Sequence, residues 1–223
     1  MKVFFDTEFT GLVPNTTLIS IGLISDTNKK FYAEFTDYDK SLCGSWIREN
    51  VIKNMSMIEP GTITEYEQKR LEILSSVHGD ISGLKKQYFK PWAIELMDDP
   101  DSVFIYGSSW KIARTLKKWF EEINKDNELI ELVSDVDHYD MTLLCNLFGG
   151  AFSLPKNVVP ACYDICQDLS DNCNMREAFD YSREEACKYY NEGRLPEGEK
   201  HNALYDAKVI KMIFEGMKGI KNG

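Results

Sequence analysis

Two carboxylates near the start of the chain have the residue type and spacing of a metal-binding pair. Asp6 and Glu8 follow the apolar run Val3-Phe4-Phe5, which has the composition of a buried strand. Successive side chains of a strand point to opposite faces, so Asp6 and Glu8 share one face. Neighbouring carboxylates repel each other unless a cation lies between them. A hard divalent ion such as Mg²⁺ meets this need, because it takes oxygen ligands in an open, hydrated site.

Two further acids stand at the ends of predicted elements. Asp140 lies where a predicted strand passes into a helix, and Asp206 lies in the first turn of a final amphipathic helix. The small neighbours Ala203 and Ala207 would let that helix pack closely on a sheet. Four carboxylates that converge at one end of a sheet could hold two divalent ions about 3.5–4 Å apart. Such a pair of ions activates water and stabilises the departing oxygen of a phosphodiester.

A histidine precedes the last of these acids. His201 lies five residues before Asp206 and just ahead of the predicted helix. A neutral imidazole there could take a proton from the activated water as a general base. A lone histidine before a helix is more often a surface or capping residue. The combination with Asp206 and with the upstream acids favours the general base.

These side chains must be positioned by an alternation of strands and helices. Strands are predicted at 2–8, 16–25, 31–36, 102–107 and 128–137, and helices at 44–52, 109–124, 138–148, 183–191 and from about 202 onward. The first three strands, joined by short turns, predict an antiparallel meander that carries Asp6 and Glu8 on its first member. The stretch 53–101 is polar and irregular, and we expect it to be an insertion in a single domain spanning 1–223.

Composition limits the partners and the location. The 223 residues include 43% hydrophobic ones, which is enough for a conventional core, and no apolar run approaches the roughly 20 residues of a membrane span. The start lacks the apolar region of a signal peptide, so we expect a cytoplasmic protein without a membrane partner. The six cysteines are then expected to be free thiols, because Cys162, Cys166 and Cys173 are poorly spaced for zinc.

The charge balance restricts the kind of nucleic acid that could bind. Lys and Arg total 26 against 36 acidic residues, a formal net charge of −10. This argues against neutralising many phosphates of a long duplex, yet it allows a site that holds a few terminal nucleotides. We expect short substrates or a local basic channel, with Arg48, Lys111 and Arg114 as candidates. The basic face of the predicted helix at 109–124 is more simply a solvated face.

Three motifs in order resemble those of the DEDD exonuclease superfamily. Asp6-Thr7-Glu8 followed by Thr10-Gly11 resembles its first motif, Tyr139-Asp140 its second, and His201-x-Ala203-x-x-Asp206 the third motif of the DEDDh subclass, which uses histidine as the base. Asp135 and Asp137 lie close to Asp140 and leave the second motif ambiguous; Asp140 is preferred because it follows the exit of the strand. Segments 5–9, 18–22, 45–48 and 144–149 look like the RNase T-like 3′ exoribonuclease group.

The resemblance implies a fold, an activity and a set of roles. The fold would be α/β and RNase H-like, with a mixed five-stranded sheet flanked by helices. The activity would be 3′-5′ exonuclease action on single-stranded RNA or DNA, with RNA favoured, releasing nucleoside 5′-monophosphates with two Mg²⁺ or Mn²⁺ ions. Related enzymes commonly act as homodimers. The implied metal ligands are Asp6, Glu8, Asp140 and Asp206, the implied base is His201, and the implied contacts to the terminal nucleotide are Thr7, Phe9 and Leu12.

Two other functional classes use the same scaffold or the same acids. One is a non-catalytic nucleic-acid-binding or assembly module on an RNase H-like scaffold, which would be marked by the loss of a carboxylate or of the base; none is missing. The other is a two-metal hydrolase that acts on nucleotides or pyrophosphate. The third motif, together with Thr10-Gly11 after the first acids, favours the exonuclease.

Overall fold

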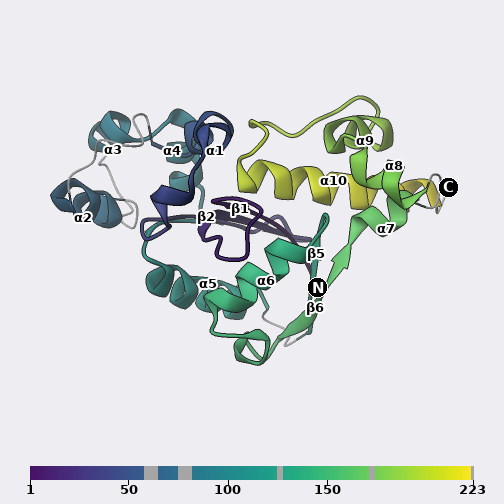
Figure 1. Ribbon diagram of the computed structural model, residues 1–223, viewed down its shortest axis with the longest axis horizontal. Coiled ribbons are helices and arrows are strands. Elements are labelled where there is room, and N and C mark those ends of the chain that lie inside the picture. Colours follow the sequence, from purple (N-terminus) through teal and green to yellow (C-terminus); the bar gives the residue numbers. More distant parts are fainter. Residues whose placement is uncertain (58–64, 75–81, 125–127, 171–173, 222–223) are drawn as a thin grey trace.

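A mixed six-stranded sheet forms the centre of the structure, a computed structural model that describes residues 1–57, 65–74, 82–124, 128–170 and 174–221 (Figure 1). The strands lie in the order β4-β3-β2-β1-β5-β6. Their bounds are β1 Lys2–Phe9, β2 Leu18–Ser25, β3 Lys30–Phe35, β4 Ser102–Gly107, β5 Ile130–Ser134 and β6 Val158–Asp164. The α/β class with a mixed sheet flanked by helices is therefore confirmed.

The predicted meander is present in the first half of the sheet. β1 pairs with β2, and β2 with β3, in antiparallel register. β4 lies parallel to β3, while β5 lies parallel to β1. The pairing of β5 with β1 covers only Lys2 to Phe4, so β1 continues beyond its neighbour toward its carboxyl end. The two acids of the first motif lie on this extension.

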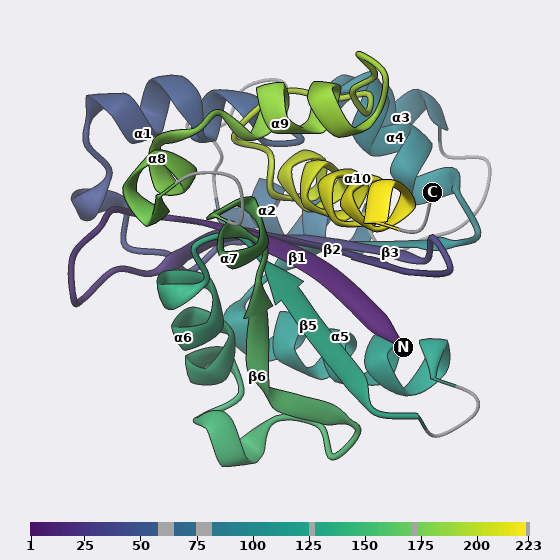
Figure 2. The ribbon, with the colours of Figure 1, turned by 90° about the vertical axis from the view of Figure 1, so that its right-hand side faces the viewer.

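Helices cover both faces of the sheet. They are α1 Ser45–Asn50, α2 Glu65–Leu74, α3 Ser82–Tyr88, α4 Pro91–Asp98, α5 Ser109–Ile123, α6 His138–Leu147, α7 Ile165–Leu169, α8 Met175–Asp180, α9 Arg183–Tyr190 and α10 Ala203–Lys221. Figure 2 shows α10, α9 and α4 above the sheet and α5 and α6 below it. In the described part of the chain, no helix is both long enough and apolar enough to cross a membrane.

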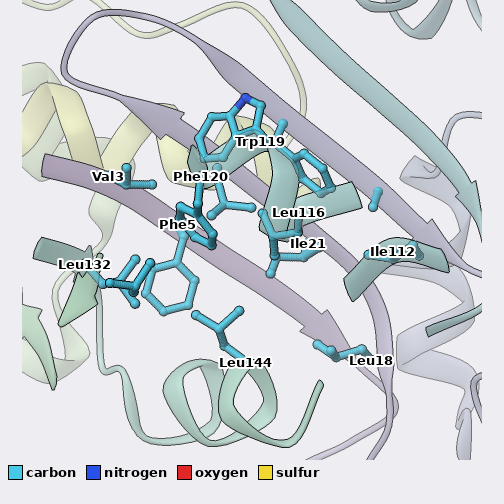
Figure 3. Close-up of a cluster of buried hydrophobic side chains, with 14 of the residues drawn as sticks. Val3, Phe5, Leu18, Ile21, Ile112, Leu116, Trp119, Phe120, Leu132 and Leu144 are labelled. Atoms are coloured by element: carbon cyan, nitrogen blue, oxygen red, sulfur yellow. The ribbon is translucent and has the colours of Figure 1, made fainter. Parts of the chain in front are cut away.

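The alternation of β1 divides its side chains between these two layers. Val3 and Phe5 point into the core formed with α5 and α6, where they lie near Leu116, Phe120 and Leu144 (Figure 3). Phe4 points to the opposite face and meets Phe214 of α10 edge to face, with ring centroids 5.3 Å apart. Asp6 and Glu8 continue the face of Phe4, so they project toward the layer of α10, as the period of two requires.

The sheet has one strand more than the five that the resemblance implied. β6 pairs in parallel with β5 at the edge of the sheet, in a segment that was expected to hold only a loop and helices. It contains Pro160, which lacks an N–H and is tolerated in edge strands. Most of β6 is exposed or half-buried, so the apolar pattern of a central strand is missing.

The segment 53–101 contains the short 3₁₀ helix η2 Ile52–Asn54 at its start, followed by α2, α3 and α4 in the described residues. That it is an insertion stays a prediction. The cysteines at 43, 145, 162, 166 and 187 are free thiols, as expected, while Cys173 and His78 lie outside the described residues.

The close approach of α10 to the sheet depends on Gly22 of β2. Gly22 lies directly opposite Asp6 in the β1–β2 ladder. A Cβ atom at Gly22 would lie 2.2 Å from the backbone nitrogen of Leu204 and 2.4 Å from the carbonyl carbon of Ala203. Ala203 and Ala207 are fully buried in the same contact, as their small size predicted. The first turn of α10 therefore rests on the strand that pairs with the acids.

We expect Gly22→Ala to push α10 away from the sheet, because backbone atoms cannot yield as a flexible side chain can. Overpacking of this kind costs about 1–3 kcal/mol or somewhat more in the free energy of unfolding, measured by chemical denaturation. Gly219→Ala is the matched control, because a Cβ there meets nothing within 4 Å and alanine favours a helix. Equal stability of the two variants would contradict the account of Gly22.

Candidate active site

The start of α10 brings Asp206 beside Glu8 of β1. The Asp206 carboxylate accepts a hydrogen bond of 2.8 Å from the backbone N–H of His201, which fixes its rotamer. Ligand atoms of Glu8, His201 and Asp206 all lie within 4.8 Å of one another. The Nδ1 atom of His201 lies 3.8 Å from Oε1 of Glu8. Three of the predicted site residues thus form one compact group.

Asp140 reaches the same end of β1 from the other layer. Its Oδ1 accepts a 2.9 Å hydrogen bond from the backbone N–H of Thr7 and a second one from the Thr7 hydroxyl. Thr7 lies beyond the last residue of β1 that pairs with β5, so its N–H is free to bind this side chain. Asp140 is buried, with 6% of its surface exposed, in the first turn of α6. Thr7 thereby fixes the fourth acid next to Asp6.

Burial raises the pKa of every carboxyl in this group, and the charges of the other acids add to the rise for Asp6 and Glu8. Burial raises the pKa of Asp6 well above its usual range, and the charges of Asp140, Asp206 and Glu8 add to it. The pKa of Glu8 rises for the same reasons, burial first and then Asp206 and Asp140.

The pKa values of Asp140 and Asp206 rise less, because hydrogen bonds to these two carboxylates partly offset the effect of burial. Burial raises the pKa of Asp140 to about 7, against the two bonds from Thr7. It raises the pKa of Asp206 to about 7, against the bond from the His201 N–H. Because three of these acids act on Asp6 and two of them act on Glu8, the four form one electrostatic unit, which favours the binding of either protons or cations.

His201 combines an unusual backbone conformation with a half-buried imidazole. Its backbone has φ of +63°, in the left-handed region that non-glycine residues seldom adopt. Burial lowers the pKa of the imidazole, and the charge of Lys200 lowers it further, so the neutral form dominates near pH 7. The side chain stays 29% exposed, so water can reach it.

The neighbouring acids of the second motif have other partners. Asp135 forms an ion pair with Arg183 of α9. Asp137 lies near the Cys162 thiol of β6, where its charge contributes to raising the pKa of that group after burial. Asp137 is not among the charges that raise the pKa of Asp6, whereas Asp140 is the largest of them. The geometry therefore places Asp140 in the acid cluster and Asp137 outside it.

The three residues expected to contact a terminal nucleotide differ in their surroundings. Thr7 is buried and uses its N–H and its hydroxyl to hold Asp140. Phe9 is half-buried and stacks on Tyr139, with ring centroids 5.2 Å apart. Leu12 is 76% exposed in the turn after β1. Phe9 and Leu12 thus offer apolar surface near the acids.

Trp46 was missed as a site residue, because its spacing with Ile47 and Val51 suggested a buried helix face. It is instead 54% exposed, and its ring meets the His201 ring edge to face at 5.0 Å. The contact joins residues far apart in sequence, so no local pattern could have predicted it.

The basic residues expected near a channel are engaged locally. Arg48 donates to the carbonyl of Cys43, and Lys111 donates to the carbonyl of Glu72. Arg114 lies over the Trp110 ring at 5.5 Å. These contacts fit the solvated helix face better than a phosphate channel.

The donor set fits hard divalent cations. Asp6, Glu8, Asp140 and Asp206 supply only carboxylate oxygens, the ligands that Mg²⁺ and Mn²⁺ prefer. Their raised pKa values indicate that the hydrogen bonds from Thr7 and His201 compensate the charged forms only in part. A cation among them would supply that compensation.

Comparison with known proteins gives a short sequence match. No protein-family model matches the chain. Two curated 3′-5′ exoribonucleases, from Mycobacterium tuberculosis strains CDC 1551 and H37Rv, are 36% identical over 55 residues. The match covers 25% of this chain and 33% of each relative. The solved Neurospora crassa Pan2 catalytic unit (protease and nuclease domain) aligns with 99% of this chain and 27% of its own, at a TM-score of 0.45 and 12% identity. That likeness is too low to assign a fold or an activity.

The acid cluster predicts that Mg²⁺ stabilises the protein more at alkaline than at acidic pH. Without metal, the folded protein keeps protons on Asp140 and Asp206 up to about pH 7, whereas the unfolded chain loses them near 3.8. The free energy of unfolding therefore falls as the pH rises through this window, and a bound cation restores it.

Thermal melting with and without Mg²⁺ at about pH 5 and about pH 8 measures this effect. Asp140→Asn is the informative variant, because an amide oxygen still accepts both Thr7 bonds while the charge is removed. It should flatten the pH dependence and weaken the response to Mg²⁺. An equal response of the wild type at both pH values would contradict the prediction.

Proposed function

We propose that this protein is a metal-dependent 3′-5′ exonuclease that removes terminal nucleotides from single-stranded RNA. One observation carries the proposal: β1, α6 and α10 bring Asp6, Glu8, Asp140 and Asp206 into one buried electrostatic unit beside His201. Structural ion pairs would be neutralised by nearby lysine or arginine, and these acids have no such partner among the described residues.

The four acids would hold two divalent ions. Bound there, such ions supply a polarised water and stabilise the charge on the phosphodiester oxygens during in-line displacement. The rigidity of the acids comes from the protein: Asp6 and Glu8 lie on a strand, Asp140 is fixed by Thr7, and Asp206 by the His201 N–H. Preorganised ligands keep the reorganisation during the reaction small.

His201 would accept the proton of the attacking water at an imidazole nitrogen. The lowered pKa keeps this nitrogen unprotonated near neutral pH, as a base requires. Because the His201 N–H binds the Asp206 carboxylate, the base and one metal ligand keep a fixed relation to each other.

Apolar side chains beside the acids would receive the terminal nucleotide. Phe9 and Leu12 lie at and just beyond the end of β1, and Trp46 lies against His201. Aromatic rings stack on bases of any sequence, each stack contributing about 1–3 kcal/mol. A single strand can present its end to such a site, whereas a duplex end would first have to unpair. RNA as the substrate is supported by the names of the two partial relatives.

End-labelled RNA and DNA oligonucleotides of one sequence, incubated with Mg²⁺ or Mn²⁺, test the proposal. We expect stepwise shortening of RNA from the 3′ end and release of nucleoside 5′-monophosphates. Asp140→Asn should abolish the shortening, because it removes a metal ligand while preserving its hydrogen bonds, and Asp137→Asn should leave it intact. Products on a gel and by chromatography are the readout.

Several outcomes would reject this assignment. Shortening from the 5′ end, activity in EDTA, or full activity of Asp140→Asn would each do so. Loss of activity in Asp137→Asn with retention in Asp140→Asn would show that Asp137, and not Asp140, is the metal ligand. Faster cleavage of DNA would keep the exonuclease and overturn the RNA preference.

The base role predicts a loss in kcat without a matching loss in affinity. His201→Asn is the best substitution, because asparagine tolerates the positive φ of this position. We expect kcat to fall about 10²–10⁴-fold, the usual contribution of general base catalysis. His138→Asn, at an exposed histidine on α6, is the control. A weaker affinity with unchanged kcat in His201→Asn would show that the histidine binds substrate and does not take the proton.

A further inference from the structure

A groove of about 800 Å³ lies behind the loop that carries His201, and no role proposed above uses it. One wall is formed by η2, Lys90 and α4, and the other by α10 and residues 197–199 of the preceding loop. Both α4 and α10 lie on the same face of the sheet (Figure 2). A groove of this size can hold several ligand groups.

Lysines from separate elements line this groove. Lys53 and Lys90 lie toward one end, close enough for the Lys90 ammonium to donate to the Lys53 carbonyl. Lys30 and Lys208 are the other two lysines of the lining. Lys53, Lys90 and Lys208 form no ion pair with any carboxylate in the described ranges. Lys90 and Lys208 donate to the backbone carbonyls of Lys53 and Glu197, and an ammonium group with one such bond keeps further N–H donors for an anion.

Four carboxylates also line the groove, and the charges of Glu199 and Glu197 act on Lys90 and Lys208. Asp99 is bound by Lys30 at 2.7 Å, which lowers the pKa of that carboxyl to about 2. Glu95, Glu197 and Glu199 are exposed, so their side chains can turn toward solvent. Lys90 and Lys208 are recessed, and a recessed charge is screened less by water and salt than an exposed one. Two of the lysines are thus more recessed than three of the acids.

The groove extends to the residue that follows the proposed base. Asn202, which follows His201 directly, lines it, as does Asn54. The Asn54 amide donates to the Lys200 carbonyl at 2.7 Å, so the boundary between groove and site is a short stretch of ordered backbone. Trp92 is half-buried in the same wall, with a ring on which a base could stack. The loop before α10 is thus shared by the groove and the candidate site.

We propose that the groove binds backbone phosphates of the substrate strand on the 5′ side of the nucleotide being removed. This inference rests on the proposed function. Lysine ammonium groups bind phosphates as point charges and do not read sequence, so the groove would favour longer strands of any sequence. The chemistry required of the ligand is a row of phosphates, with Trp92 as a place for one base.

The test compares a dinucleotide with an octanucleotide of related sequence. Lys53→Gln/Lys208→Gln removes two unpaired charges from the groove, and Lys53→Arg/Lys208→Arg keeps them. Lys117→Gln/Lys118→Gln removes two charges from the exposed face of α5, on the other side of the sheet, and controls for net charge. Thermal melting verifies that each variant is folded.

We expect kcat/KM for the octanucleotide to fall about tenfold in the Gln/Gln groove variant, with a salt slope smaller by about 1 to 2, while the dinucleotide changes less than about twofold. The Arg/Arg variant and the α5 control should behave as wild type. Equal losses on both substrates, or no loss on the octanucleotide, would overturn the inference.

Two further measurements distinguish a failure of this inference from a failure of the proposed function. If the groove variant loses affinity for free nucleoside 5′-monophosphate or pyrophosphate without any effect of strand length, the groove binds a small phosphate ligand and the inference is wrong. If the wild type cleaves neither substrate, the proposed function fails. In that case, fluorescence anisotropy of a labelled octanucleotide in EDTA tests binding to the groove independently of cleavage. The inference is supported only if the Gln/Gln variant binds the octanucleotide more weakly than the wild type does.

Discussion

Repulsion among buried carboxylates is the constraint that the rest of the structure must overcome. Glu8, Asp140 and Asp206 each raise the pKa of Asp6, so without a cation these charges oppose folding. The fold resists this with a rigid frame: every residue of β2, the strand paired with the acids, is buried. Each acid that comes from a helix is then fixed by a donor, Asp140 by Thr7 and Asp206 by the His201 N–H. The packed core therefore contributes the free energy of folding that offsets the repulsion within the site.

The loop before α10 links the frame to the segment 53–101. His201 adopts a left-handed backbone conformation, which must be held by its surroundings. Asn54 provides part of that support by donating to the Lys200 carbonyl, while the Asp206 carboxylate binds the His201 N–H from the other side. The first residues of the segment therefore help to place the proposed base. Whatever its origin, this segment contributes to the site and to one wall of the groove.

The sequence was sufficient for the features that follow from local patterns. Alternation along β1 placed Asp6 and Glu8 on one face, and the period of the last helix placed Asp206 in its first turn, because both rules depend only on neighbouring residues. β6 was not predictable, since an exposed edge strand with Pro160 lacks the buried pattern of a central one. The role of Thr7 was also hidden: it depends on β5 ending early, so that an N–H of β1 is left for Asp140. The contact of Trp46 with His201 and the lining of the groove each bring together residues that are far apart in sequence. A local sequence pattern cannot predict such contacts.

The acidic net charge and a polyanionic substrate are compatible because of where the charges lie. A formal charge of −10 repels a nucleic acid at long range, but over exposed surface this repulsion is screened within about 8–10 Å at physiological salt. Close contact is decided by the charges at the site, where the acid cluster requires cations and the groove places recessed lysines beside it. Such an arrangement would lower the rate of association with long nucleic acids. It would keep the affinity for a strand end that has already entered the site. Net charge therefore disfavours binding along a duplex and is compatible with the proposed action on a 3′ end.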